Sequence, residues 1–204
     1  MELDHIAIAG GTLSEAAAFT EARLGIALQA GGAHDVFFTH NKLLGLEDGL
    51  YLEAIAIDPM APKPERPRWF DLDRFQGSPR LTNWICRCDD LDATLARLPE
   101  GMGDPVQLQR GDLRWRMAVP ETGILPFDNC APALIQWQTA PHPAQKLLRS
   151  HIRLTRLVVQ HPRIQELAEV LSGQISDPRI VFAVGPAGLL ADFDTPLGQR
   201  SISA

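Results

Sequence analysis

Short apolar stretches followed by helical periodicity recur three times along the 204-residue chain. The segments that open these units, residues 3–13, 81–91 and 154–164, align without gaps. Each reads as an apolar strand, a polar turn and the start of a helix, and the starts lie 78 residues (3 to 81) and 73 residues (81 to 154) apart. Because repeats of similar length indicate repeated structural units, we expect three modules of similar architecture.

The residues that follow each strand carry helix signals. Apolar positions recur at intervals of three and four residues, which is typical of a helix with one buried face. In the first unit Thr12 and Glu15 can form a capping box, and Gly25 can end the helix. The second and third helices are expected to begin near Asp90 and Pro162.

Three strands are predicted after each helix. They are 26–31, 36–46 and 50–57 in the first unit, 106–110, 113–119 and 133–138 in the second, and 179–184, 189–194 and 198–202 in the third. The pattern predicts an α+β fold of repeated βαβββ modules, at residues 1–57, 80–143 and, in compact form, 150–204. Segment 58–79 is expected to be a crossover loop whose Trp69, Phe70, Leu72 and Phe75 are buried.

Charge and composition narrow the class of partner. The net charge is −6 with no cluster of Lys or Arg, so neither nucleic acid nor a membrane surface is indicated, and a small molecule is expected instead. No stretch approaches the roughly 18 apolar residues of a membrane-spanning helix. The three cysteines do not suit a disulfide framework, which favours a reducing, cytoplasmic location. Cys86 and Cys88 are interpreted as strand residues because no second pair accompanies them.

Several motifs carry a resemblance to a known family. The runs Leu3–Ile8, Tyr51–Ile55 and Cys88–Asp92 resemble the vicinal oxygen chelate superfamily, which includes glyoxalases, extradiol dioxygenases and epimerases. A bacterial glyoxalase-like subgroup is similar over residues 3–143, through Gly31–His34, Thr39–Asn41, Tyr51–Glu53, Trp69–Phe70, Trp115–Arg116 and Pro126–Phe127, followed by Trp137 and His142–Pro143. The resemblance implies cupped mixed sheets, with helices on their outer face, around a small-molecule site.

In that superfamily a divalent metal is bound by the first and last strands of paired modules. Carried over by position, the resemblance implies His5 and Glu53 as metal ligands or as a catalytic acid–base pair. The second module offers Asn83 and Gln136 at the corresponding positions, and Arg156 takes the equivalent place in the third. Because neutral amides are poor ligands for transition metals, the resemblance implies a weakly bound divalent metal or none.

Other polar residues are candidate ligand contacts. The subgroup resemblance implies that His34, Thr39 and Asn41 line the site, although polar residues near a hairpin also satisfy backbone groups. Arg87 alternates onto the expected inner face, where it would bind a carboxylate or phosphate, or pair with Glu53. Together with Asn83 and Gln136 these residues form the predicted binding set.

The sequence leaves two functions open. The first is a lyase, isomerase or dioxygenase-like enzyme acting on a small oxygenated metabolite, and the second is a metal-free protein that binds or sequesters such a molecule. The incomplete ligand set favours the second unless the amides coordinate. No nucleotide-binding motif is present, so no nucleotide cofactor is expected. The tryptophans are expected in the core, and His142 is expected in a turn. The modules could pair within one chain or in a homodimer.

Overall fold

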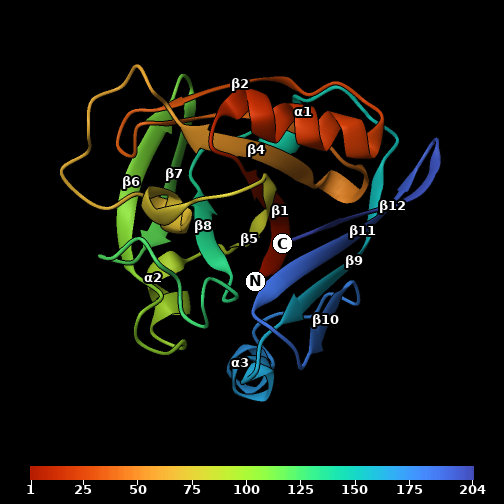
Figure 1. The fold of residues 1–204 in the computed structure, drawn as a ribbon. Helices are drawn as coiled ribbons and strands as arrows, with labels where there is room; N and C mark the ends of the chain where they lie inside the picture. Colours follow the sequence, from red (N-terminus) through yellow and green to blue (C-terminus); the bar gives the residue numbers. More distant parts are fainter.

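The computed structural model describes all 204 residues and contains two β-sheets (Figure 1). The strands are β1 (Glu2–Ala9), β2 (Gln29–His34), β3 (Thr39–Gly45), β4 (Tyr51–Ile57), β5 (Arg80–Arg87), β6 (Asp104–Arg110), β7 (Leu113–Val119), β8 (Ala133–Trp137), β9 (Arg153–Gln160), β10 (Ile180–Ala183), β11 (Gly188–Thr195) and β12 (Gly198–Ser203). The larger sheet has the order β2-β3-β4-β1-β5-β8-β7-β6, and the smaller has the order β10-β9-β11-β12.

Three α-helices and three short 3-10 helices connect the strands. They are α1 (Leu13–Leu24), α2 (Leu91–Leu95), α3 (Ile164–Leu171), η1 (Glu47–Gly49), η2 (Trp69–Arg74) and η3 (Pro143–Gln145). The predicted capping box is confirmed, since Thr12 Oγ1 accepts from Glu15 N (3.2 Å) while Glu15 Oε2 accepts from Thr12 N (2.9 Å). Gly25 ends α1 with a φ of 74°. None of these helices is both long enough and apolar enough to cross a membrane.

The eight-stranded sheet consists of two equivalent halves. In the first half β1 pairs in parallel with β4, and in the second β5 pairs in parallel with β8. The antiparallel pair of β1 and β5 joins the halves at the centre of the sheet. The two βαβββ units therefore pair within one chain, and the predicted α+β fold with cupped mixed sheets is confirmed.

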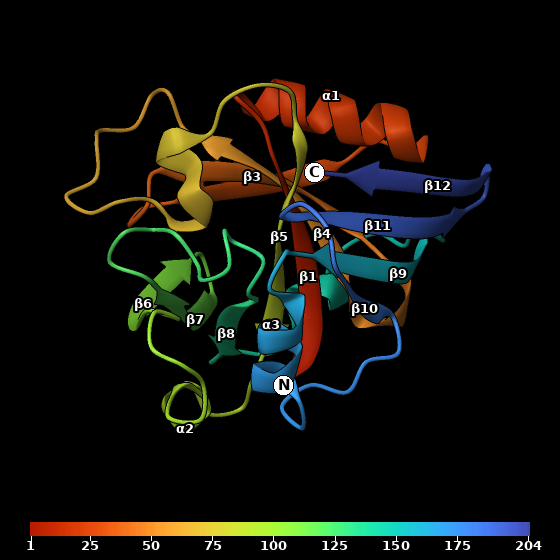
Figure 2. The ribbon, with the colours of Figure 1, turned by 60° about the horizontal axis from the view of Figure 1, so that its bottom comes forward.

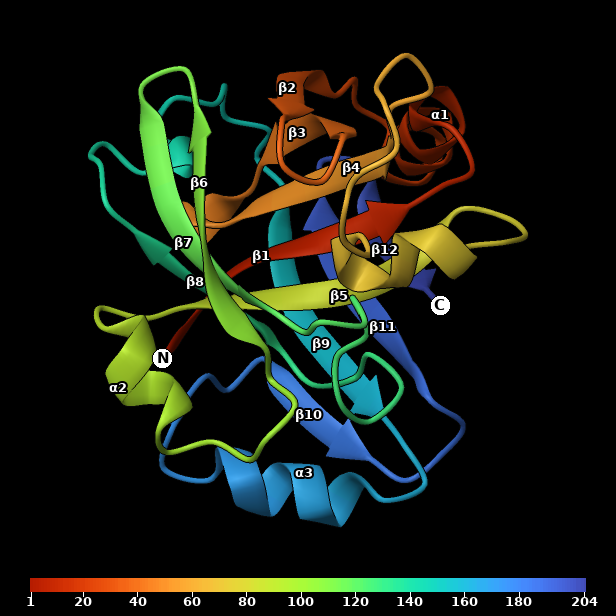
Figure 3. The same cartoon turned by 90° about the vertical axis from the view of Figure 1, so that its left-hand side faces the viewer.

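The sheet curls until its two edges approach each other. Strands β2 and β6 are last in the strand order at opposite ends, yet they are in contact. The side chain of Arg110, at the end of β6, crosses this seam and donates to Asn41 of β3 (3.1 Å). Figure 3 shows β6 and β7 on one side of the cup and β2 and β3 on the other. The concave face is consequently enclosed on several sides by the sheet itself.

The third unit has the expected order of elements but a different arrangement of strands. In this unit β10 follows α3 and lies next to β9, parallel to it. The strands that follow the helix in the first two units, β2 and β6, lie instead at the outer edges of the large sheet. Strands β11 and β12 pack behind β5, and α1 lies against β12 (Figure 2). The local pattern of strand and helix is thus repeated, while the pairing of the strands is not.

The crossover loop covers the concave side of the sheet. Trp69, Phe70 and Leu72 are buried as predicted, whereas Phe75 is only partly buried. The ring of Trp69 stacks on Phe37, with 4.4 Å between ring centroids. These contacts hold the first turn of η2 over the site described below.

Candidate functional site

Three neighbouring strands bring polar side chains to the concave face of the large sheet. Ala7 of β1 pairs with Glu53 of β4 on one side and with Asn83 of β5 on the other. Side chains of directly paired residues lie on the same face, and His5 shares this face because it is two residues from Ala7. The small side chain of Ala7 therefore lies between a carboxylate, an amide and an imidazole.

A small cavity of ≈30 Å³ lies over this region. Its polar lining residues are His5, His34, Asn41, Tyr51, Glu53 and Arg110, and its apolar ones are Leu43, Trp69, Phe70, Trp115, Met117, Ile135 and Trp137. This volume accommodates about one or two water molecules. A metabolite would therefore enter only if part of the wall moves.

A buried carboxylate fixes the orientation of His5. Asp4 Oδ1 accepts a hydrogen bond from His5 Nδ1 (2.6 Å), while Oδ2 accepts from Trp137 Nε1 (3.1 Å) and His142 Nε2 (2.9 Å). Burial raises the pKa of Asp4, but the hydrogen bonds from His142 and His5 outweigh it and hold the pKa below its usual range. Since Nδ1 donates to Asp4, the lone pair of the neutral imidazole ring lies on Nε2, which faces Glu53 in the cavity. The ring of Tyr51 stacks on His5 at 4.2 Å.

Glu53 faces His5 across the cavity. Its Oε2 lies 3.8 Å from His5 Nε2, which is longer than a hydrogen bond and leaves both atoms available to a ligand. The other oxygen, Oε1, accepts from Asn41 Nδ2 (2.5 Å). Asn41 Oδ1 accepts in turn from Gly32 N (2.8 Å) and Arg110 Nη1 (3.1 Å). These three contacts fix the orientation of the amide and hold the Glu53 carboxylate in place.

His34 is a neutral member of the cavity wall. Burial, and to a smaller extent the nearby charge of Arg110, lower the pKa of His34 to about 3. The Nε2 atom accepts from Arg110 Nη1 (3.3 Å), so Nδ1 carries the proton and donates to Thr39 Oγ1 (2.9 Å). Thr39 is fully buried and does not line the cavity. It positions His34 rather than contacting a ligand.

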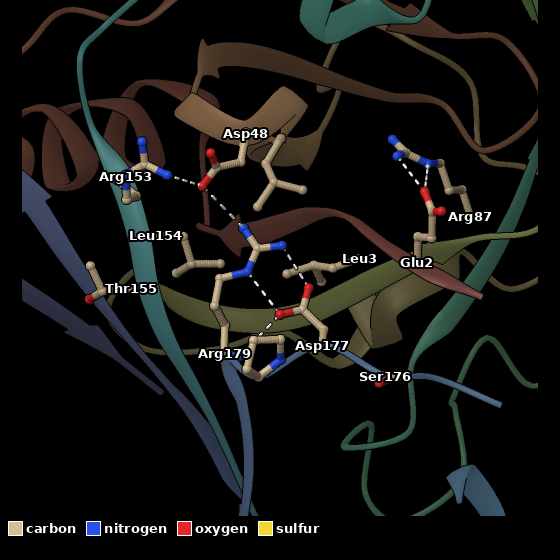
Figure 4. Close-up of a pocket in the computed structure, with 12 residues that line it drawn as sticks. Glu2, Leu3, Asp48, Arg87, Arg153, Leu154, Thr155, Ser176, Asp177 and Arg179 are labelled. Atoms are coloured by element: carbon tan, nitrogen blue, oxygen red, sulfur yellow. Dashed lines mark hydrogen bonds and ion pairs between the residues drawn. The ribbon is translucent and has the colours of Figure 1, made fainter. Parts of the chain in front are cut away.

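Arg87 lies outside the cavity, contrary to the prediction from strand alternation. Its Nη2 pairs with Glu2 Oε2 (2.6 Å) in a cleft of ≈650 Å³ between the two sheets (Figure 4). The register of β1 against β5 shifts between Leu3 and His5, so Arg87 at the end of β5 meets Glu2. All three arginines of the cleft are paired with carboxylates: Arg87 with Glu2, Arg153 with Asp48, and Arg179 with Asp177. The arginines that line this cleft are therefore already paired with carboxylates of the protein.

The second module contributes no carboxylate opposite Glu53. Gln136 faces away from the cavity, where its Nε2 donates to the backbone oxygen of Asp89 (2.6 Å). Its neighbours Ile135 and Trp137 face inward, and alternation sends Gln136 to the other side. Ile85 is the repeat counterpart of Ala7 (78 residues further along), and it pairs with Ala133 as Ala7 pairs with Glu53. The true counterpart of Glu53 is therefore Ala133.

Asn83 lies where the repeat places it, as the counterpart of His5 in the second module. Its side chain is fully buried, and neither Oδ1 nor Nδ2 has a hydrogen-bond partner. An unpaired buried polar group costs about 1–3 kcal/mol. Such a group on the face that carries His5 and Glu53 is a candidate contact for a bound ligand.

The roles of several residues of the site were not anticipated from the sequence. Asp4 precedes His5 in an apolar strand. Because a buried carboxylate must be paired or hydrogen-bonded, its place in this strand could have indicated a role in the site. His142 was interpreted as a turn residue, and Trp137 as a core residue, yet both bind Asp4. No sequence pattern around Arg110 indicated that it belongs to the site, because its partners lie across the seam of the curled sheet.

The donor set around His5 does not fit a tightly bound transition metal. His5 and Glu53 are two donors, and no group of three or more His, Cys, Asp or Glu residues is arranged to bind a metal ion. Catalytic zinc sites have three protein ligands and structural sites have four. Ala133 provides no donor, and Asn83 provides only a neutral amide.

A curled sheet of two βαβββ units around a concave polar site is the architecture of a glyoxalase-like protein. The sequence model of the glyoxalase-like domain matches residues 3–175, so the chain belongs to the glyoxalase-like domain family. This agrees with the family resemblance of the sequence motifs.

Solved structures with similar folds are more distant. A hypothetical protein from Staphylococcus aureus is 14% identical, with a TM-score of 0.60 over 91% of this chain and 86% of that chain. Methylmalonyl-CoA epimerase from Mycobacterium tuberculosis is 22% identical, with a TM-score of 0.43 over 70% of this chain and 91% of that chain. At 14% identity the first likeness concerns the fold alone. No curated protein matches the sequence.

Proposed function

We propose that this protein binds a small oxygenated metabolite in the concave cavity and that His5 transfers a proton to and from it. The observation that carries the proposal is the buried Asp4–His5 pair, whose free Nε2 faces Glu53 at 3.8 Å. A histidine oriented by a buried carboxylate is a suitable general base, because the carboxylate fixes the tautomer and stabilises the imidazolium. The donor set supports a reaction that does not depend on a bound metal ion.

The proposed step is proton abstraction next to a carbonyl group. His5 Nε2 takes the proton from carbon, the electrons of the C–H bond form an enolate, and negative charge develops on the former carbonyl oxygen. Return of a proton to the same carbon restores the carbonyl group, and its delivery to the opposite face inverts that carbon, which completes an isomerisation. Asn83 Nδ2 is a buried donor without a partner, and a hydrogen bond to the developing oxyanion would satisfy it. Glu53 holds the position opposite His5 and is the second group able to exchange a proton.

Ligand entry requires movement of the wall over the cavity. Every residue that lines the cavity belongs to a strand of the large sheet except Trp69 and Phe70 in η2. Phe70 and the following Asp71 have φ values of 59° and 56°, a left-handed conformation that is unfavourable for residues other than glycine. Because the strands are fixed by their ladders, the crossover loop is the element that we expect to move.

The test is solvent deuterium exchange followed by proton NMR. The full-length protein is incubated in D₂O with hydroxyacetone, 2-oxobutyrate and 2-oxobutyramide, and loss of the signal next to the carbonyl is timed. We expect exchange that persists after treatment with a chelator and falls by about 10²- to 10⁴-fold in His5→Gln. Glu53→Gln should also slow exchange.

His151→Gln is the matched control, because the His151 side chain is exposed and pairs only with Glu47 at 3.7 Å. Exchange that is unchanged in His5→Gln, or abolished by the chelator, would overturn the proposal. Binding of a probe in the cavity without any exchange would also overturn the proton-transfer step. The protein would then bind its ligand at this site without catalysing proton transfer.

A further inference from the structure

Arg110 is a cation in the cavity wall that has no acidic partner. Its hydrogen bonds are those from Nη1 to Asn41 Oδ1 (3.1 Å) and to His34 Nε2 (3.3 Å). Both acceptors are neutral, since Asn41 is an amide and burial keeps His34 uncharged at neutral pH. The other guanidinium nitrogens, Nε and Nη2, make no hydrogen bond to the protein. The charge of Arg110 is therefore not neutralised by any salt bridge.

The surroundings of Arg110 favour an anionic ligand over water. The apolar part of the cavity lining includes Trp69, Phe70, Trp115 and Trp137, which reduce the local dielectric and strengthen electrostatic attraction. A guanidinium presents a planar fork of donors that matches the two oxygens of a carboxylate. Placing a cation in such a wall without a counter-ion costs free energy, which a bound carboxylate would offset.

The position of Arg110 also fits the reacting end of the site. A continuous path of hydrogen bonds runs from Arg110 through Asn41 to Glu53, whose free oxygen faces His5. Arg110 and the Glu53–His5 pair thus line one cavity, and the side-chain amide of Asn41 lies between them. A ligand with a carboxylate at one end and a carbonyl or hydroxyl carbon a few bonds away would reach both.

We propose that the ligand is a small 2-oxo or 2-hydroxy carboxylate and that Arg110 binds its carboxylate group bidentately at the seam between β2 and β6. This inference rests on the proposed function only in taking the same cavity as the ligand site. Arg110 thereby takes the role of anion recognition that the sequence had suggested for Arg87, which is paired with Glu2 outside the cavity.

The experiment compares ligands that differ only in charge. Dissociation constants of 2-oxobutyrate and its neutral analogue 2-oxobutyramide are measured by ligand-observed NMR on the full-length protein, its Arg110→Gln and Arg110→Lys variants, and a control. We expect the carboxylate to bind about 10- to 100-fold more tightly than the amide, and Arg110→Gln to remove this preference. Arg110→Lys keeps the charge but loses the fork, so it should retain only part of the preference.

Arg114→Gln is the matched control, because this exposed residue on β7 has the same charge, and its guanidinium hydrogen-bonds Gln109 (3.3 Å) outside the cavity. It should leave both dissociation constants unchanged. Should Arg110→Gln fail to fold, Arg110→Lys and the pair of ligands decide the question on the folded protein. Equal binding of carboxylate and amide, no binding of either, or an unchanged preference in the Arg110 variants would overturn the proposal.

The two proposals fail in different ways. If hydroxyacetone exchanges its protons through His5 while 2-oxobutyrate binds no better than its amide, proton transfer stands and recognition by Arg110 is wrong. If 2-oxobutyrate binds through Arg110 without exchange, the carboxylate site stands and the catalytic proposal is wrong.

Discussion

Replacing His34 by glutamine should make the stability of this protein less sensitive to mild acid. The pKa of His34 is about 3 in the folded protein, against 6.5 for a free histidine. Between these two values the unfolded chain binds a proton that the folded protein does not bind. The free energy of unfolding therefore decreases as the pH falls below about 6.5, by about 1.4 kcal/mol per pH unit. At about pH 5 the expected loss from His34 alone is about 2 kcal/mol.

The assay is urea unfolding followed by tryptophan fluorescence, at about pH 7.5 and about pH 5. Glutamine keeps one donor for Thr39 and one acceptor for Arg110 but does not titrate. The wild-type protein should lose about 2 kcal/mol more than His34→Gln between the two pH values. Other titrating groups, including Asp4, contribute to both proteins and cancel in this difference.

His151→Gln removes an exposed histidine and should show the same pH dependence as the wild type. If His34→Gln and the wild type lose the same stability to within about 0.5 kcal/mol, then His34 is not held neutral by burial. Arg110 would then hydrogen-bond to a titrating histidine rather than to two neutral acceptors.

Two further outcomes follow from packing and burial. In Gly31→Ala the new Cβ would lie 1.9 Å from Asn41 Oδ1 and 2.6 Å from the Asn41 backbone oxygen, so we expect a loss of about 1–3 kcal/mol in the same urea assay. Unaltered stability would show that β2 can move away from β3. Burial raises the pKa of all three cysteine thiols, so alkylation at about pH 8 should be slow in the folded protein and fast in urea. Rapid labelling of any native thiol would contradict this.

Much of the candidate site could be located from the sequence. His5 and Glu53 were placed on one face from the repeat and the family resemblance, and the structure brings them to 3.8 Å. The hairpin residues His34 and Asn41 were also expected near the site, and both line the cavity. Gln136 was misplaced because the length of β8 left its register open. Gln136 lies three residues beyond Ala133, the counterpart of Glu53, and a shift by an odd number of residues moves a side chain to the other face.

What the sequence alone determined are the features set by short-range physics. Capping by Thr12 and Glu15 and the alternation along each strand depend on residues close in the chain, so the order of elements followed from them. The tertiary structure decided which strands pair and how far the sheet curls. Only that curl brings Arg110 to Asn41, and only the tertiary structure brings Trp137, at the end of β8, and His142, just before η3, to Asp4. These contacts join residues 69 to 138 positions apart, and they depend on the packing of whole sheets, which no local pattern records.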